Sequence, residues 1–95
     1  VGQSSYSAAK AAIEVATKVW SKELSIFKIR VACISPGYIN VESTNQNITK
    51  IEKEKITNSI PLKRLGKINE IISGINFIIN NKYFNGKTLK IDGGK

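Results

Sequence analysis

The feature that most constrains the fold is a short stretch, "IRVACIS", at residues 29–35. Its middle is nearly all apolar and lacks the polar alternation of a half-exposed strand. A strand of this kind is typically covered on both faces, as in a parallel sheet. Near the C-terminus, "GKTLKIDGG" at residues 86–94 predicts a second short strand that ends in a Gly-Gly turn. Because a helical segment separates the two strands, we expect them to pair in parallel.

Three other segments predict helices. Apolar residues recur at three-four spacing from Ser4 to about Ser25, which indicates one long amphipathic helix. A shorter helix from Thr49 to about Ser59 opens with a capping box, Thr49-x-x-Glu52. A third, from about Ile68 to Asn80, carries an isoleucine stripe. On the first helix, the expected apolar side holds Ala9, Ala12, Ile13, Ala16, Val19, Trp20 and Leu24, and the polar side holds Tyr6, Lys10, Glu14, Lys18 and Lys22.

The order of elements is therefore helix, strand, loop, helix, helix, strand. A strand covered on both faces needs further strands and helices around it, and one crossover cannot supply them. We therefore expect an α/β fold in which residues 1–95 are the C-terminal part of a larger, Rossmann-like doubly wound parallel sheet. The opening residue, Val1, also suggests a start within a longer chain.

The amino-acid composition excludes several kinds of catalytic and metal-binding site. The chain contains no His and a single cysteine, Cys33, so it offers no internal disulfide, no cluster of metal ligands and no Ser-His or Cys-His nucleophile. A single cysteine fits a reducing, intracellular compartment, and we expect a cytoplasmic protein. No apolar run is long enough to span a bilayer, so we expect no membrane partner.

The net charge of +8 raises the alternative of a nucleic-acid binder. The lysines are, however, spread along the chain and do not alternate with aromatic residues. Isoleucine, lysine and asparagine are all abundant, a bias that AT-rich coding produces without selection for binding. We therefore favour a solvated lysine-rich surface and expect no nucleic-acid partner; steeply salt-dependent DNA binding would support the alternative.

The stretch "YSAAK" places Tyr6 and Lys10 four residues apart, on one face of a helix. A tyrosine is a weak acid at neutral pH, and a neighbouring ammonium favours its phenolate form. The pair could therefore be a proton donor and the cation that tunes it, or two ordinary residues of the charged stripe. Ser4 and Ser5 have no histidine to activate them, so helix capping is the favoured role for them.

"PG" at Pro36 and Gly37 ends the first strand at its carboxyl edge, where ligands bind in open α/β sheets. Proline lacks an N–H and glycine lacks a Cβ, so the backbone can turn sharply and approach a flat ring closely. An ordinary turn between strand and loop would show the same residues.

Four segments in a fixed order, "GQSSYSAAKAA", "IRVACISPGYI", "IPLKRLGKINEI" and "GKTLKIDGG", resemble the C-terminal half of the short-chain dehydrogenase/reductase family. The branch they resemble most is the 3-oxoacyl-(acyl-carrier-protein) reductases. The resemblance implies an NAD- or NADP-dependent reduction of a carbonyl compound or acyl thioester, in an enzyme that assembles as a homotetramer. It assigns Tyr6 as proton donor and as part of the cofactor site, and Lys10 as the cation beside it that also binds the nicotinamide ribose. Pro36, Gly37 and Ile39 would line the nicotinamide pocket, with the Ile39 backbone holding the carboxamide.

The resemblance also predicts what this sequence does not contain. The family's Gly-rich turn, active-site asparagine and carbonyl-polarising serine would precede Val1, so the N-terminal cofactor-binding half of the domain is expected to be absent. Val41 stands where the family often has a cofactor-contacting Thr, although Ser43 and Thr44 lie close by, and Ile68 replaces a helix-opening proline.

The polar stretch from Val41 to Ser59 matches the family's substrate lid. Its lysines and the residues that follow it could attract an acidic partner such as an acyl carrier protein, although coding bias explains them equally well; they are Lys50, Lys53, Lys55, Lys63 and Arg64. A non-catalytic, truncated relative that only oligomerises or binds a partner is the alternative function. On either interpretation we expect the isolated 95-residue chain to be poorly folded and inactive.

Overall fold

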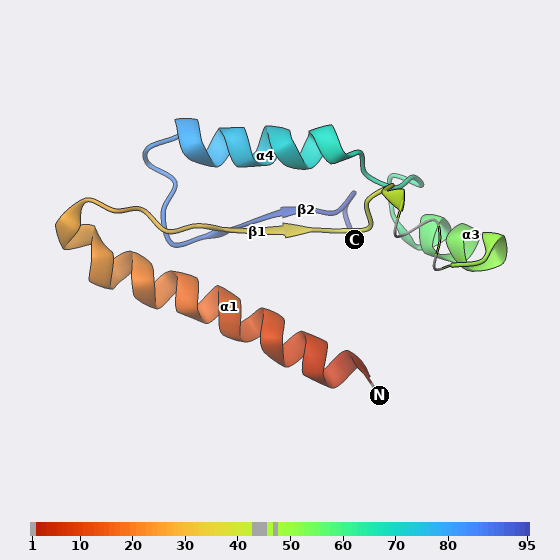
Figure 1. The fold of residues 1–95 in the computed structure, drawn as a ribbon, viewed down its shortest axis with the longest axis horizontal. Coiled ribbons are helices and arrows are strands. Elements are labelled where there is room, and N and C mark those ends of the chain that lie inside the picture. Colours follow the sequence, from red (N-terminus) through yellow and green to blue (C-terminus); the bar gives the residue numbers. More distant parts are fainter. Residues whose placement is uncertain (1, 43–45, 47) are drawn as a thin grey trace. The chain divides into compact units, whose positions relative to one another are not determined.

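The computed structural model of the protein describes residues 2–42, 46 and 48–95. Its elements follow the predicted order of helix, strand, loop, helix, helix and strand (Figure 1). They are α1 (Gly2–Leu24), the 3₁₀ helix η1 (Ser25–Phe27), β1 (Cys33–Pro36), α3 (Lys50–Ser59), α4 (Ile68–Asn80) and β2 (Thr88–Ile91). Within these ranges, no helix has the length and apolar character needed to cross a membrane.

The two strands form a parallel pair, as predicted (Figure 1). The Cys33 N–H donates to the Lys87 carbonyl at 3.1 Å, and the Gly37 N–H donates to the Ile91 carbonyl at 2.8 Å. Both partners advance by the same number of residues, which is the register of a parallel ladder. The first strand is shorter than predicted, because β1 begins at Cys33 and not at Ile29.

The chain divides into two compact units. Unit 1 contains residues 1–33 and 78–89, and unit 2 contains residues 34–77 and 90–95. In unit 1, the segment before β1 bonds to the turn before β2: the Val31 N–H donates to Asn85 Oδ1 at 3.0 Å, and the Gly86 N–H donates to the Val31 carbonyl at 2.7 Å. These bonds occupy part of the backbone that the sequence had assigned to the strand.

Helix α1 buries a different face from the one that its apolar residues predicted. Its buried side chains are Thr17 and Ser21, which are 4% and 5% exposed, whereas Ile13 and Trp20 are 57% and 53% exposed. Each buried hydroxyl donates to a carbonyl of its own helix, so burial leaves no donor unpaired. Small side chains are required here because Gly86 approaches closely: a Cβ on Gly86 would lie 2.5 Å from Ser21 Oγ.

Arg30 closes the C-terminal end of α4, within unit 1. Its Nη1 donates to the carbonyls of Ile78, Asn81 and Phe84 at 2.8, 3.1 and 3.0 Å. Its Nη2 donates to the carbonyl of Ile79 at 3.1 Å. The last carbonyls of a helix have no partner inside the helix, and a guanidinium with five donors can satisfy several at once.

Unit 2 is centred on Ile60, which is 1% exposed. The segment after β2 packs directly against it, since a Cβ on Gly93 would lie 2.6 Å from Ile60 Cγ2. The Leu62 N–H also donates to the Gly93 carbonyl at 3.2 Å, so backbone hydrogen bonding holds the end of β2 against this turn.

The two remaining helix predictions are confirmed. Thr49 caps α3, because its Oγ1 accepts the Glu52 N–H at 3.1 Å, which is the first half of the predicted capping box. Helix α3 contains no buried residue, as expected from its few apolar positions. Helix α4 has the predicted bounds, although Ile71 is the only isoleucine among its buried residues.

Candidate active site

The carboxyl end of β1 is held closely against the end of β2. Gly37 follows the last strand residue, Pro36, and its N–H extends the ladder to the Ile91 carbonyl. A Cβ on Gly37 would lie 2.7 Å from Asp92 Cα and 2.8 Å from Asp92 Cβ. From the sequence, a glycine is expected here so that a ligand ring can approach the backbone closely. The structure adds a reason within the chain, which is the approach of the neighbouring backbone.

Two residues further on, Ile39 forms an isolated parallel bridge with Gly66. The Gly66 N–H donates to the Tyr38 carbonyl at 2.9 Å, and the Asn40 N–H donates to the Gly66 carbonyl at 2.8 Å. In such a bridge, the central residue directs its own N–H and C=O away from its partner strand. The Ile39 carbonyl accepts the Val41 N–H at 2.9 Å, and the Ile39 N–H has no acceptor among the described residues.

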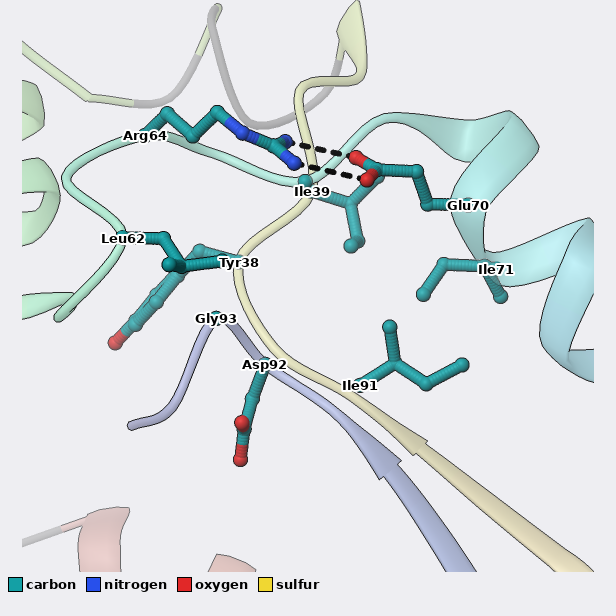
Figure 2. Close-up of a pocket in the computed structure, with 10 residues that line it drawn as sticks. Tyr38, Ile39, Leu62, Arg64, Glu70, Ile71, Ile91, Asp92 and Gly93 are labelled. Carbon is teal, nitrogen blue, oxygen red and sulfur yellow. Dashed lines mark hydrogen bonds and ion pairs between the residues drawn. The ribbon is translucent and has the colours of Figure 1, made fainter.

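An ion pair borders this segment. Arg64 Nη1 lies 2.8 Å from Glu70 Oε1, and Arg64 Nη2 lies 2.9 Å from Glu70 Oε2, a two-pronged arrangement that Figure 2 shows. Glu70 Oε1 also accepts the Lys67 N–H at 2.9 Å. Glu70 thereby reaches back to the residue before α4, which supplies a cap where Ile68 replaces the family's proline.

These contacts explain the ionisation of the pair. The hydrogen bonds from Arg64, and then from the Lys67 N–H, lower the pKa of Glu70 to about 2, and the hydrogen bond to Glu70 raises the pKa of Arg64. Because the Glu70 pKa falls below its ordinary 4.5 on folding, its stabilising effect is complete above pH 4.5 and is lost as the pH falls through about 2. The two side chains are 48% and 38% exposed, so salt should weaken their attraction.

A pocket of about 100 Å³ lies beside the Ile39 segment. Figure 2 shows the side chains of Ile39, Ile71 and Ile91 around it, with the Arg64–Glu70 pair along one side. Its wall is thus mostly aliphatic with one charged border. It opens where both strands end, the edge at which ligands bind in α/β sheets.

The predicted pair Tyr6 and Lys10 lies in unit 1, on α1. Tyr6 is 65% exposed. Lys10 is half-buried, in line with the covered stripe of Thr17 and Ser21, whereas Lys18 is exposed. Within the predicted polar stripe, Lys10 and Glu14 are thus partly covered, whereas Lys18 and Lys22 are exposed. Within the described ranges, the side chains of Tyr6 and Lys10 have neither a hydrogen bond nor an ion pair.

The predicted residues thus fall into two sets. Pro36, Gly37 and Ile39 follow one another at the sheet edge of unit 2, and Tyr6 and Lys10 share a helix of unit 1. The capping role expected of Ser4 and Ser5 is wrong, because both lie inside α1, which begins at Gly2. Ser43 and Thr44, proposed neighbours of Val41, lie outside the described residues.

Three residues that bond to or border the Ile39 segment were not predicted from the sequence as part of the site: Gly66, Arg64 and Glu70. A signal for Glu70 was present, because it follows Lys67 by three residues just before an apolar helix, the spacing of a reach-back cap. The bridge between Ile39 and Gly66 has no comparable sequence signal. Among the described residues, no three acidic or cysteine side chains gather in a way that could hold a metal ion.

Comparisons with known proteins provide independent evidence about this chain. A family model described as enoyl-(acyl carrier protein) reductase matches residues 1–95. The 3-oxoacyl-[acyl-carrier-protein] reductase FabG of Thermotoga maritima is 37% identical over 95 residues, which are 98% of this chain and 38% of that protein. The human 3-oxoacyl-[acyl-carrier-protein] reductase is 32% identical over 93 residues, with the same coverage. This chain therefore spans well under half the length of these relatives.

A solved structure shares the fold. The crystal structure of YwfH, described as an NADPH-dependent reductase involved in bacilysin biosynthesis, matches with a TM-score of 0.79 and 29% identity. The match covers 88% of this chain and 36% of YwfH. The predicted α/β architecture is confirmed by this likeness and by the parallel strand pair.

Proposed function

This chain belongs to the short-chain dehydrogenase/reductase family, and on that premise we propose that it is the C-terminal portion of one domain of an NAD- or NADP-dependent oxidoreductase. The reaction is the reduction of a carbonyl group, or the oxidation of the corresponding alcohol. The proposed substrate class is a 3-oxoacyl thioester, in line with the names of the FabG relatives. The nicotinamide dependence is in line with the description of YwfH.

The observation that carries the proposal is the Ile39 N–H, which has no acceptor among the described residues. The bonds of Tyr38 and Asn40 to Gly66 fix the backbone on either side of it, so the donor has a set direction before any ligand arrives. A carboxamide oxygen is a suitable acceptor for such a donor. Pro36, Gly37 and Ile39 would hold the nicotinamide, whose chemistry when bound is hydride transfer, and Ile39 would orient it.

Tyr6 and Lys10 have the acid-base role in this proposal. The Tyr6 hydroxyl donates a proton to the substrate's carbonyl oxygen during reduction and takes it back during oxidation. The Lys10 ammonium, one helical turn away, places a positive charge on the same face of α1 and donates hydrogen bonds to the nicotinamide ribose. The half-buried position of Lys10 and the exposure of Tyr6 support this division, since the tyrosine must reach a substrate.

The partners form part of the same proposal. Helix α3, with its capped start and lack of buried side chains, would belong to a lid over the substrate. We also propose a homo-oligomer, with a tetramer as the specific expectation. Large apolar side chains left exposed on the described helices support it, as surfaces for further parts of the protein or for a second copy; they include Ile13, Val19, Trp20, Ile68, Ile72 and Ile75.

The test is Tyr6→Phe in the full-length protein. Removing the hydroxyl should lower kcat by about 10²- to 10⁴-fold, while cofactor affinity and the thermal unfolding midpoint stay close to wild type. Tyr83→Phe is the matched control, because Tyr83 is 99% exposed in the turn before β2 and should tolerate the same change without effect.

Two results would contradict the proposal. Undiminished turnover by Tyr6→Phe would remove Tyr6 from the mechanism. A full-length wild-type protein that binds neither NADH nor NADPH would instead favour the alternative, a non-catalytic module that oligomerises or binds a partner.

A further inference from the structure

We infer that Arg64 and Glu70 are positioning residues for the cofactor: they fix the loop before α4, and through Gly66 this loop sets the direction of the Ile39 N–H. The inference rests on the proposed function, because it gives that N–H the nicotinamide carboxamide as its acceptor. All the contacts involved lie within unit 2.

The first step is the fixing of the loop. Glu70 is anchored on α4, and its carboxylate holds Arg64 by two hydrogen bonds and the Lys67 N–H by a third. Arg64 Nη1 also donates to the Leu65 carbonyl at 3.1 Å. These bonds tie both ends of the short segment 64–67 to one side chain. Charge-assisted, two-pronged bonds of this kind constrain geometry more than single neutral ones do.

The second step is the transfer of that constraint to Ile39. Gly66 lies inside the segment and bonds on both sides of Ile39, to the Tyr38 carbonyl and the Asn40 N–H. A Cβ on Gly66 would lie 2.9 Å from Ile39 Cδ1 and 3.7 Å from the Tyr38 carbonyl oxygen, so the Ile39 side chain and the Tyr38 backbone both lie close to Gly66. A shift of the loop therefore moves the backbone that flanks the Ile39 N–H.

A purely structural role for the pair is the competing explanation, because Glu70 also caps α4. The chain offers a control at the other end of the same helix. Arg30 holds the C-terminal carbonyls of α4 by four hydrogen bonds, but none of them involves the Gly66 bridge. A variant at Arg30 should therefore destabilise the helix without redirecting the Ile39 N–H.

The experiment compares Glu70→Gln, Arg64→Lys and Arg30→Lys in the full-length protein. Calorimetry measures the affinity of each for NAD⁺ and NADP⁺, and for a pyridine analogue of the tighter-binding coenzyme that lacks the carboxamide. We expect Glu70→Gln and Arg64→Lys to weaken binding of the natural coenzyme by about 3- to 10-fold, the value of one hydrogen bond, and the analogue by less than about twofold. Arg30→Lys should lower the thermal unfolding midpoint and leave the ratio of the two affinities at the wild-type value.

Hydrogen exchange supplies a readout that needs no cofactor. The Gly66 N–H, which donates to the Tyr38 carbonyl, should exchange faster in Glu70→Gln and Arg64→Lys and at the wild-type rate in Arg30→Lys. Unchanged Gly66 exchange, or equal losses for coenzyme and analogue, would overturn the inference while leaving the proposed function intact. Wild-type protein that binds no coenzyme would overturn both.

Discussion

The two sets of candidate site residues are built in different ways. Around Ile39, the backbone is bonded on either side to Gly66, and Gly37 is bonded to Ile91, so the chain itself sets the geometry. Tyr6 and Lys10 are instead side chains on one helix, without a hydrogen bond or an ion pair in the described part of the chain. The first set centres on a backbone donor between two hydrogen-bonded residues, and the second is a pair of side chains related by helical spacing.

The difference follows from what each set is proposed to do. A donor that orients a ring must hold one direction, and a hydrogen-bonded backbone can hold it at little entropic cost. A group that exchanges protons with a substrate must be reachable, and Tyr6 is well exposed. Each set nevertheless depends on a glycine that allows a close approach, Gly86 in unit 1 and Gly37 in unit 2.

The largest expected effect comes from Gly86→Ala, which strains the unit that carries Tyr6 and Lys10. Gly86 has φ +70°, and the new Cβ would lie 2.5 Å from Ser21 Oγ on α1. A strained backbone plus a clash should lower the free energy of unfolding by about 3 kcal/mol and reduce kcat by shifting α1. Chemical denaturation of the full-length protein measures the first effect. Adding Ser21→Ala should recover part of the loss; strict additivity of the two changes would contradict the clash.

Next comes Gly37→Ala, which acts on the Ile39 set. Its Cβ would meet the Asp92 backbone at 2.7 Å, which cannot move without shifting β2, so we expect a loss of about 2 kcal/mol and weaker coenzyme binding. Gly66→Ala is the matched comparison, because its Cβ would meet only the end of the Ile39 side chain, at 2.9 Å, and should cost about 1 kcal/mol. Denaturation measures both losses. A larger loss for Gly66→Ala than for Gly37→Ala would show that the strand ends accommodate a Cβ more easily than the bridge does.

The smallest expected effects are increases in the free energy of unfolding, and each unit offers one substitution that should produce such an increase. Lys28 in unit 1 and Lys63 in unit 2 have φ of 60° and 57°, a left-handed conformation that favours glycine. Lys28→Gly should raise the free energy of unfolding by up to about 1 kcal/mol. Lys63→Gly should gain less, since the Lys63 Nζ donates to the Asn58 carbonyl. Lys22→Gly, inside α1, is the control and should lose about 1 kcal/mol. A loss at Lys28 would contradict the assigned strain.

Local sequence signals predicted the helices and strands well. Tertiary packing determined where β1 begins and which face of α1 is buried. The cap at Thr49, the bounds of α4 and the terminal Gly-Gly turn each depend on residues within a few positions of one another, and the structure confirms them. The start of β1 and the covered stripe of α1 were mispredicted, because both depend on a distant turn. Asn85 and Gly86 bond to Val31 before the strand begins, and Gly86 admits only a small residue such as Ser21.

The sequence by itself determined the family, the order of helices and strands, and the candidate residues Tyr6, Lys10, Pro36, Gly37 and Ile39. Each of these follows from periodicity, from turn chemistry or from motifs in a fixed order. Only the tertiary structure decided that the Ile39 N–H, beside a bridge to Gly66, has no acceptor among the described residues, that an ion pair lies close to that bridge, and that Lys10 lies on the covered side of α1. The physical reason is that hydrogen-bond direction and burial are set by segments far apart in the chain, and no local pattern records which of them will meet.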